Sequence, residues 1–558
     1  MLLMNIARNA SGQAAHFREC LGQHLIASYV SLFDFRVKVC SCDILESKEI
    51  ILKEIDQHRV KVVGFYIGAD TVVMIGNLIR WLKKIRKVVV IVGGPEAYAL
   101  DEKFLNDTGC DCGVYGEGEV PVLSLLRWAV DGIGSRSQIK SLKYLDEKGI
   151  YHVTPPEEPI KDLDSIPFPQ WENSLNKRFR MGESMGILTG RGCPYHCSFC
   201  FEGAVSKTVR QRSMENVIQE IEEVRRKNPF LRCVNVYDDT FTLNRERVLQ
   251  FCSYMREQGL LWSCEGHVSR LCEYPEVIKT MVDSGLIAMQ IGIESGSRKV
   301  LRAYHKGTTP EMIETVVKEC KGAGLLTLEG NYIVGGAFED WDTVEESIAH
   351  AKRLLEVGRG MLELSTVFFS PYFGTPITKN PRKFGMRIED NEKHTVISMR
   401  DAVVSTQALS AEDIVKAKER FDNELRKKYY EEAVRCTKKD VLSGTSRSNR
   451  KMRINQNWCG AWNQYSFIKE FAQHRNAAEQ TFDSDKYPIR TIGAYFLKEN
   501  SFFAQGIRLE GIEKDAVLYA DGRKKAGEIA DILNLSISQI KEVYEGLNER
   551  CLVYFSEF

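Results

Sequence analysis

The sequence predicts an α/β protein with two units built on parallel sheets, an N-terminal doubly wound sheet and a central partial barrel of six β/α units, followed by a small C-terminal domain. Short runs of apolar residues, as buried parallel strands require, alternate with stretches of helical spacing before residue 130 and again over 184–400. A stretch rich in glycine, serine and proline separates the two series. The 558 residues suffice for several domains of roughly 150 residues each.

The N-terminal unit is predicted to span residues 1–135. Residues 60–67 and 88–94 are near-continuous apolar strands, and residues 72–85 between them have the spacing of a helix. A strand, a helix and a second strand in this order build a doubly wound parallel sheet. Residues 136–182 contain closely spaced prolines and are predicted to be a surface linker.

The central unit is predicted to span residues 183–400, where strands and helices alternate again. We expect strands at 186–189, 233–237, 287–293, 330–334 and 362–368, and helices at 214–227, 245–258, 276–284, 310–323 and 342–355. This alternation predicts a partial barrel, whose chemistry belongs at the C-terminal ends of its strands.

The remaining chain is divided into a helical connector, residues 401–485, and a winged-helix-like domain, residues 486–558. Ser410 and Asp413 resemble a capping box at the start of a charged helix that runs to about residue 433. In the last domain we expect strands near 507–509 and 516–519, a turn at 521–522, helices at 526–533 and 536–550, and a strand at 553–555.

Composition excludes several classes of protein. Lys plus Arg and Asp plus Glu both number 76, so no overall field attracts nucleic acid or an anionic membrane. No apolar run reaches the roughly 18 residues of a membrane helix, and the first residues lack the pattern of a secretory signal. We therefore expect a cytoplasmic protein whose 16 cysteines are reduced, with a few metal ligands among them.

Three cysteines carry the most specific signal in the chain. Cys193, Cys197 and Cys200 lie on one tight loop that follows a predicted strand. Three thiolates at this spacing can hold one [4Fe–4S] cluster and leave its fourth iron without a protein ligand. A zinc site with His196 as fourth ligand is the alternative.

With this loop, residues 184–380 resemble the radical S-adenosylmethionine (SAM) superfamily. The resemblance implies that the open iron chelates SAM and that an electron from the cluster cleaves it to a 5'-deoxyadenosyl radical. It also implies SAM contacts at Phe199 in the cysteine loop and, at the ends of predicted strands, at Asp238 or Asp239, Glu294, Ser295, Gly335 and Gly336. Arg210 and Arg212 stand just before a predicted helix, where a guanidinium could meet the SAM carboxylate bidentately. The aspartates could instead begin a turn, Glu294 could be a helix cap, and Arg210 with Arg212 could be a solvated helix start.

Two glycine-rich loops in the N-terminal unit extend the resemblance to the cobalamin-binding radical SAM enzymes, over residues 1–380. The family binds cobalamin between the two units. The contacts that the resemblance implies are Tyr66, Gly68, Asp70, Thr71, Gly93, Gly94, Glu96, Gly116, Glu117, Gly118 and Glu119. The chain has no Asp-x-His-x-x-Gly motif, and His16 and His24 are in the wrong setting, so the lower ligand of cobalt is not assigned.

The resemblance implies radical methylation of an unactivated carbon in a peptide or small-molecule natural-product precursor. One SAM would methylate cob(I)alamin and a second would supply the radical, with an external electron donor of the flavodoxin or ferredoxin type. The family also contains cyclases and enzymes of rearrangement, and a sensor that uses the cluster or corrin is a further alternative. Methylthiolation is disfavoured because it needs a second cluster on three further cysteines. The N-terminal unit offers two pairs separated by one residue, Cys40 with Cys42 and Cys110 with Cys112, and no loop with three cysteines. No catalytic acid or base is assigned.

The C-terminal domain resembles the small peptide-chaperone domains that bind leader peptides of ribosomally made natural products. Those domains add the peptide as a strand at a sheet edge. An intramolecular lid and a helix-turn-helix DNA reader are the alternatives. The mixed charge of residues 536–550 is poorly suited to phosphate contacts, so we expect no nucleic-acid partner.

Overall fold

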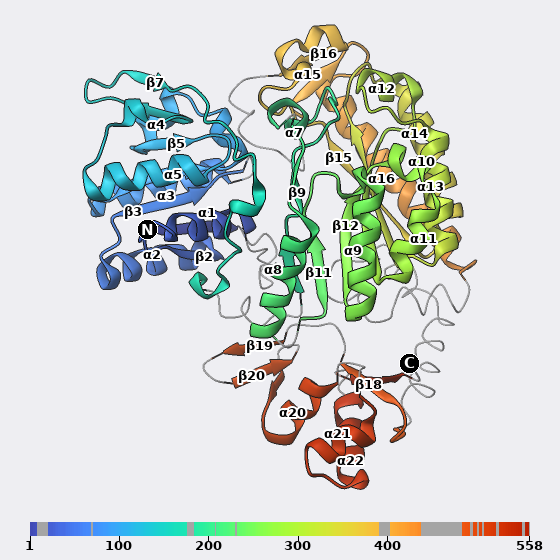
Figure 1. Ribbon diagram of the computed structural model, residues 1–558. Helices are drawn as coiled ribbons and strands as arrows, with labels where there is room; N and C mark the ends of the chain where they lie inside the picture. The colour runs from blue at the N-terminus through green and yellow to red at the C-terminus, as the bar shows by residue number, and fades with distance from the viewer. Residues whose placement is uncertain are drawn as a thin grey trace.

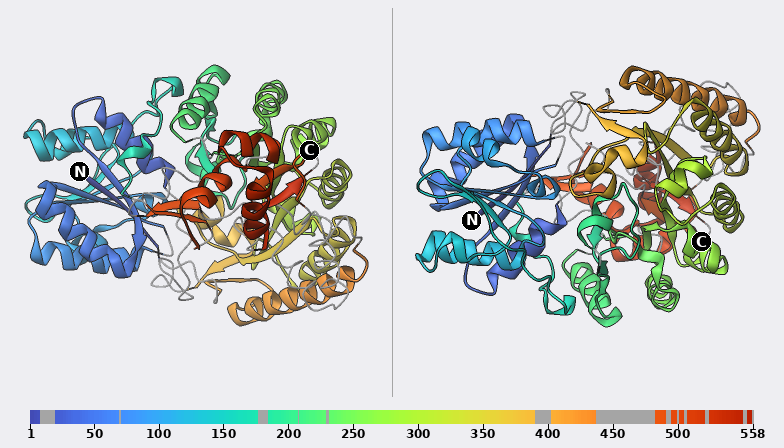
Figure 2. Two further views of the ribbon diagram at one scale, coloured as in Figure 1. Left: turned by 90° about the horizontal axis from the view of Figure 1, so that it is seen from below. Right: turned by 90° about the horizontal axis from the view of Figure 1, so that it is seen from above.

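The protein is described here from a computed structural model. The described residues are 1–7, 20–68, 71–175, 184–206, 208–228, 231–389, 402–436, 482–490, 495–498, 501–504, 507–520, 524–549 and 553–556. Figure 1 shows the N-terminal unit (blue) beside the central unit (green to orange), with the C-terminal unit (red) beneath the central one. The two further views in Figure 2 keep the N-terminal and central units side by side.

The N-terminal unit is a seven-stranded sheet with the strand order β2-β1-β3-β4-β5-β6-β7. Its five parallel strands are β1 (Leu2–Ala7), β2 (Lys38–Asp43), β3 (Val62–Tyr66), β4 (Val89–Gly93) and β5 (Cys112–Val114). Its helices are α1 (Leu21–Ser31), α2 (Ile44–His58), α3 (Val72–Ile85), α4 (Glu102–Thr108) and α5 (Glu119–Leu126). Separate apolar clusters lie on the two faces of the sheet, which explains why β3 and β4 are apolar at almost every position.

The stretch predicted to be a linker contributes two strands to this sheet, so that prediction was wrong for residues 142–153. Strands β6 (Leu142–Leu145) and β7 (Tyr151–Val153) are antiparallel to each other, and β6 is antiparallel to β5. They were missed because both are short and Lys143 interrupts the apolar pattern. The side chain of Asp146 closes their turn by accepting hydrogen bonds from the amides of Lys148 and Ile150, each at 2.9 Å.

The central unit is a six-stranded parallel sheet, and the predicted α/β fold class is confirmed. In the order β15-β14-β13-β12-β11-β8, the strands are Leu362–Phe368, Thr327–Val334, Leu286–Glu294, Leu261–Gly266, Cys233–Val236 and Ser184–Ile187. The main helices are α8 (Met214–Lys227), α9 (Arg245–Gln258), α11 (Glu276–Asp283), α13 (Pro310–Ala323) and α14 (Trp341–Val357). Strand β12 was not predicted, because Ser263 and Glu265 break its apolar run.

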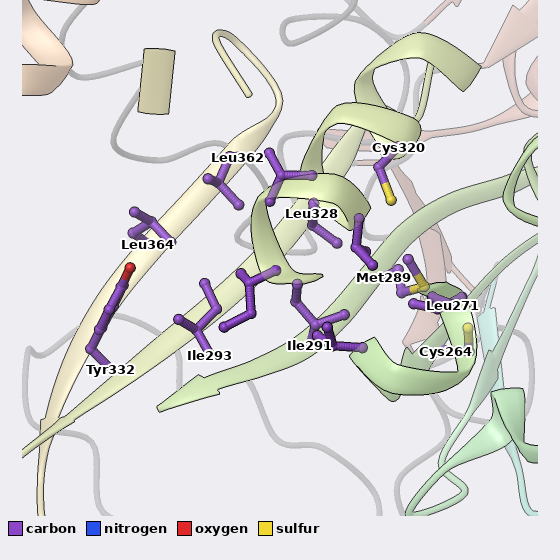
Figure 3. Close-up of a cluster of buried hydrophobic side chains, with 14 of the residues drawn as sticks. Cys264, Leu271, Met289, Ile291, Ile293, Cys320, Leu328, Tyr332, Leu362 and Leu364 are labelled. Atoms are coloured by element: carbon purple, nitrogen blue, oxygen red, sulfur yellow. The ribbon is translucent and has the colours of Figure 1, made fainter. Parts of the chain in front are cut away.

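Side chains from four strands of this sheet pack into one core with the surrounding helices. Figure 3 shows Ile291 and Ile293 of β13, Leu328 of β14, and Leu362 and Leu364 of β15 in this cluster, all of them buried. Because this core is closely packed, it fixes the strands relative to one another, and the strands fix the positions of the loops at their C-terminal ends.

Helix α16 (Ala411–Ala433) lies beside β15, at one end of the six-stranded sheet. The predicted capping box at its start is present, with the Ser410 hydroxyl and the Asp413 carboxylate each accepting the other residue's backbone N–H. The hydroxyl of Tyr429 accepts a hydrogen bond of 2.7 Å from the amide of Leu364. These contacts tie the helix to β15.

The C-terminal unit combines two small sheets with three helices. Strand β18 (Tyr487–Arg490) pairs with β22 (Val553–Ser556), and β19 (Tyr495–Lys498), β20 (Ser501–Ala504) and β21 (Ile507–Leu509) form an antiparallel sheet. The helices are α20 (Gly511–Tyr519), α21 (Ala526–Ile532) and α22 (Ile537–Glu549). The strand predicted at 516–519 is wrong, because these residues end α20. A run of four apolar residues is too short for its period to distinguish a strand from a helix.

The predicted turn at 521–522 and most of the connector after residue 436 lie outside the described residues. Within the described part of the chain, no helix combines the length and the apolar character needed to cross a membrane.

Candidate functional site

The three predicted cluster cysteines follow β9 (Gly190–Arg191) and precede α7 (Phe201–Val205), on the side of the central unit that faces the N-terminal unit (Figure 1). Gly192 has a φ of +90°, and a Cβ there would lie 2.4 Å from the carbonyl oxygen of Thr208, so the turn into the loop requires glycine. Ser198 fastens the other end, since its amide donates to the carbonyl of Tyr304 (2.9 Å) and its hydroxyl to that of Ala303 (2.8 Å). The loop is therefore held at both ends.

Cys197 is buried, whereas Cys193 and Cys200 are partly exposed. Burial raises the pKa of Cys197 to about 11, Lys306 opposes that shift, and Cys200, Glu294 and Cys193 add to it. His196, the fourth ligand of the zinc alternative, is exposed. In the part of the chain that the structure describes, no three His, Cys, Asp or Glu side chains converge on a single metal ion. Three thiols without a fourth side-chain ligand leave a tetrahedral zinc site incomplete, whereas they suffice for a [4Fe–4S] cluster whose fourth iron stays open.

The two predicted aspartates after β11 have different surroundings. Asp238 is buried and accepts a hydrogen bond of 2.6 Å from the amide of Thr189. Burial raises the pKa of Asp238 to about 6, against the opposing effect of its hydrogen bonds from Thr189. Asp239 accepts from the amide of Gly192 at 2.9 Å and lines the large cavity described below. Asp239 is thus the member of the pair that faces open space.

Glu294 ends β13 and forms a buried ion pair that the sequence did not reveal. Its Oε1 lies 2.9 Å from Nζ of Lys306, and both side chains are about nine-tenths buried. The Lys306 ammonium also lies 5.8 Å from the ring centroid of Phe199. A Cβ on Gly292 would come within 2.2 Å of the Glu294 carboxylate, so glycine there leaves space for the pair. Lys306 stands in a loop between two helices without a motif, and no signal in the sequence distinguishes it.

Backbone φ at Glu294 is +62°, a left-handed conformation that residues other than glycine rarely adopt. Such conformations concentrate at functional sites, where the surrounding structure enforces them. The next residue, Ser295, points elsewhere, since its hydroxyl lies 3.1 Å from that of Ser347 on α14. Of these two neighbours, Glu294 is the candidate that faces the cysteine loop.

The glycines after β14 are explained by protein packing. A Cβ on Gly336 would lie 1.6 Å from the Tyr304 hydroxyl, and one on Gly335, which has a φ of +87°, would lie 2.7 Å from Ile414. Glu339 accepts hydrogen bonds from both glycine amides, and burial raises its pKa to about 7. A role of these glycines toward SAM remains a prediction.

A cavity of about 1010 Å³ lies between the N-terminal and central units. The N-terminal unit contributes the glycine-rich strand ends, and the central unit contributes residues 190–192, Phe201 and Asp239. At Gly93 an added Cβ would meet only the carbonyl oxygen of Val114, at an ordinary 3.7 Å. No packing constraint demands glycine there, so the absent side chain enlarges the cavity, as a bulky bound group requires. The site fits a large planar ligand such as cobalamin.

The predicted cobalamin contacts divide into two groups. Those that line the cavity are Tyr66, Gly93, Gly94, Gly116, Glu117, Gly118 and Glu119. Gly68, Thr71 and Glu96 are not among its lining residues, and Asp70 lies outside the described residues. Thr71 closes its own turn, because its hydroxyl accepts from the Gly68 amide at 2.9 Å.

The histidine and cysteine alternatives also have structural surroundings. His24 is buried against Trp171, with ring centroids 4.6 Å apart, and His16 lies outside the described residues. Cys40, Cys42, Cys110 and Cys112 are all buried in the N-terminal sheet and its flanks. Burial raises the pKa of Cys112 to about 12.

Arg210, predicted to meet the SAM carboxylate, is paired within the protein in this structure. Its guanidinium pairs with the Glu117 carboxylate and donates to the carbonyl of Ile160 at 2.6 Å. Arg212 pairs with the buried carboxylate of Glu220. In this structure both guanidinium groups are thus engaged within the protein.

Two family models match separate parts of the chain. A model of the radical SAM superfamily matches residues 187–351, and a model of the B12 binding domain matches residues 18–126. An uncharacterised methyltransferase of Pyrococcus horikoshii is 30% identical over 338 residues, which are 59% of this chain and 70% of that protein. The anaerobic magnesium-protoporphyrin IX monomethyl ester cyclase of Rubrivivax gelatinosus is 28% identical over 278 residues, 48% of this chain, and the chain spans about half (49%) of its length.

A solved structure has the same fold. The cobalamin-dependent S-adenosylmethionine radical enzyme OxsB with aqua-cobalamin bound aligns with a TM-score of 0.60 and 14% sequence identity, over 99% of this chain and 81% of that one.

Proposed function

Because the chain belongs to the cobalamin-binding radical SAM family, we propose that it is a cobalamin-dependent radical SAM methyltransferase that acts on an unactivated carbon. The observation that carries this proposal is the shared cavity. Its N-terminal wall holds the glycine-rich loops, and its opposite wall leads directly into the cysteine loop. A corrin and a cluster held on these two walls would share one cavity.

In this proposal Cys193, Cys197 and Cys200 hold the [4Fe–4S] cluster, and the glycine-lined wall holds cobalamin. When bound, the cluster, SAM and cobalamin together supply one-electron cleavage of SAM and a carrier for the methyl group. The protein's own contribution is to bind, to orient and to exclude water. Asp239 is the candidate for the SAM amino group, and the Glu294–Lys306 pair orders the end of β13.

Substrate and partners are proposed from the C-terminal unit and the chemistry. The sheet β19-β20-β21 has an edge strand on each side, which supports recognition of an extended peptide by strand addition. We propose a ribosomal peptide or small-molecule natural-product precursor as substrate, and a flavodoxin or ferredoxin as electron donor. A cytoplasmic location is part of the proposal, since no disulfide joins cysteines within the described residues.

A ring-forming reaction is the second candidate, favoured by the similarity to the Rubrivivax gelatinosus cyclase. The two candidates differ in what becomes of SAM. Methyl transfer consumes one SAM to give S-adenosylhomocysteine for each methyl group moved, whereas ring formation through a 5'-deoxyadenosyl radical gives none.

The test is anaerobic reconstitution of the full chain with iron, sulfide and hydroxocobalamin, followed by incubation with SAM and reductant. We expect retained corrin and formation of both 5'-deoxyadenosine and S-adenosylhomocysteine. Cys197→Ala should abolish 5'-deoxyadenosine, whereas Cys272→Ala, at a half-buried thiol that donates to the Met312 carbonyl, should not. If the wild-type chain forms 5'-deoxyadenosine but retains no corrin and yields no S-adenosylhomocysteine, the methyltransferase proposal fails.

The peptide proposal has its own test. A random peptide display library selected on the full-length chain should enrich extended sequences that compete with one another for a single site. If no peptide is enriched over a library panned on bare support, the proposal of strand addition is wrong.

A further inference from the structure

Four charged side chains join the N-terminal and central units at the wall of the shared cavity. Arg191 of β9 and Arg210 of β10 (Arg210–Gln211) belong to the central unit. In the N-terminal unit, Glu117 lies in the loop after β5 and Glu119 is the first residue of α5. We call this set the interdomain charge cluster. The sequence predicted SAM binding for Arg210 and cobalamin binding for both glutamates; in this structure the four groups form ion pairs with one another.

The arrangement of the four groups is alternating and largely buried. The Arg191 guanidinium lies 2.6 Å from the Glu119 carboxylate and 3.1 Å from that of Glu117. Glu117 also pairs with Arg210, so its carboxylate bridges the two arginines. The side chains of Glu119 and Arg210 are only 4% and 9% exposed. Charged pairs this far from water are much less screened than surface pairs.

The pairing of β9 with β10 explains why the two arginines need a carboxylate between them. Strands β9 and β10 are antiparallel, and Arg191 stands directly opposite Arg210 in their register. Like charges directly opposite on paired strands repel. The glutamates of the other unit supply the compensating charge, so the two-strand ribbon is electrostatically complete only when the N-terminal unit is docked against it.

The ribbon leads directly into the cysteine loop. Arg191 is two residues before Cys193, and Gly192 between them is fixed by its hydrogen bond to Asp239 and by its left-handed backbone. On the other side, Glu119 is the first residue of α5 and lies beside the glycine loop of the cavity. The charge cluster therefore connects the base of the cysteine loop to the loop predicted to contact the corrin.

We propose that Arg191, with Glu117, Glu119 and Arg210, is a positioning device that sets the distance between SAM at the cluster and cobalamin on the facing wall. This inference rests on the proposed function. None of the four residues acts on the reacting atoms, and their role is to hold two binding loops in register. A displacement of about 1 Å between reacting groups can cost roughly 100-fold in rate.

Two half-reactions separate positioning from general damage. Cleavage of SAM to 5'-deoxyadenosine with dithionite requires only the cluster and SAM. Formation of S-adenosylhomocysteine with hydroxocobalamin and a strong reductant requires the SAM methyl group to reach cobalt, which changes from Co(I) to Co(III) as it accepts the methyl cation. Both are measured on the reconstituted full chain with SAM and hydroxocobalamin as the only added probes.

In Arg191→Gln we expect the rate of S-adenosylhomocysteine formation to fall by roughly 100-fold. The rate of 5'-deoxyadenosine formation should fall much less. Glu119→Gln should shift the ratio in the same direction. Arg191→Lys keeps the charge and should recover most of the lost rate. The matched control is Arg86→Gln, which breaks an exposed ion pair with Asp56 in the N-terminal unit and should leave the ratio unchanged.

A readout without cofactors completes the test. Hydrogen exchange of the cofactor-free chain should show faster exchange at residues 116–119 and 190–192 in Arg191→Gln than in Arg86→Gln. If both half-reactions fall together, or neither changes, or exchange is the same in both variants, the positioning role is refuted. Failure of the wild-type chain to retain corrin would instead refute the proposed function, and it is seen before any variant is made.

Discussion

The buried pair between Glu294 and Lys306 offers a quantitative test of how this site is held. The perturbation is Lys306→Met, which keeps the length of the side chain and removes its charge. At the 2.9 Å that separates Nζ from Oε1, two unit charges attract by about 6 kcal/mol at an effective dielectric constant of about 20. Desolvation of both ions offsets part of this attraction. Breaking a buried pair on one side typically costs about 3–5 kcal/mol, because the remaining charge has no partner.

We therefore expect Lys306→Met to lower the free energy of unfolding by about 4 kcal/mol. Adding Glu294→Gln removes the stranded charge, so the double variant should be more stable than the single one by about 2 kcal/mol. The assay is anaerobic guanidinium unfolding of the cofactor-free chain, followed by tryptophan fluorescence, since Trp262 lies in the same core.

The control is Lys279→Met, at a lysine whose partner Asp283 is four residues away on the exposed face of α11. The two side chains are 60% and 47% exposed, so the loss should be below about 0.5 kcal/mol. If Lys306→Met costs no more than this control, or if adding Glu294→Gln lowers stability further, the reasoning from a buried charge is wrong.

Three further outcomes are expected. Gly93→Leu should fill part of the cavity and weaken hydroxocobalamin binding, measured by visible absorption, with the far-UV circular dichroism unchanged; unaltered affinity would mean that cobalamin lies elsewhere. Burial lowers the pKa of His350 from its usual 6.5 to about 4. The folded protein is therefore at its most stable, with respect to this group, above pH 6.5, and its free energy of unfolding should fall by about 3 kcal/mol as the pH drops toward 4. His350→Gln should flatten this part of the pH profile of unfolding, and an unchanged slope would contradict the assignment. Gly336→Ala should destabilise by at least about 1–3 kcal/mol because its Cβ overlaps the Tyr304 hydroxyl, and a normal unfolding midpoint would show that the tyrosine can move.

The elements that were predicted well are those with a long, uninterrupted pattern. Helices α8, α9 and α13 begin and end at the predicted residues, because their apolar positions recur over many turns. Strand β12 was missed since polar residues interrupt it, although it contributes Trp262 to the core. A single short run gives no period, which is why residues 516–519 were predicted as a strand and are helical.

The residues of the candidate site also differ in how well the sequence alone predicts them. The three cysteines lie within residues 193–200, so their spacing alone indicated a shared cluster. Lys306 reaches Glu294 through the fold, and the contact of Arg191 with Glu119 joins residues that are 72 positions apart. The first contact depends on how a loop of the central unit folds back onto β13, and the second depends on how the two units pack. No local pattern encodes either contact.

The central sheet has a consequence for the size of molecule that the enzyme can admit. Strands β15 and β8 are the two ends of the sheet and do not pair with each other, so the barrel is an open arc. In a closed barrel, strand number and stagger fix the diameter. Here the gap between β15 and β8 is not set by inter-strand hydrogen bonds. Helix α16, which flanks β15, belongs to no strand pair and can be altered without breaking an inter-strand hydrogen bond. Relatives that share this sheet could therefore accept substrates of different size by changing only the segments beside the gap between β15 and β8.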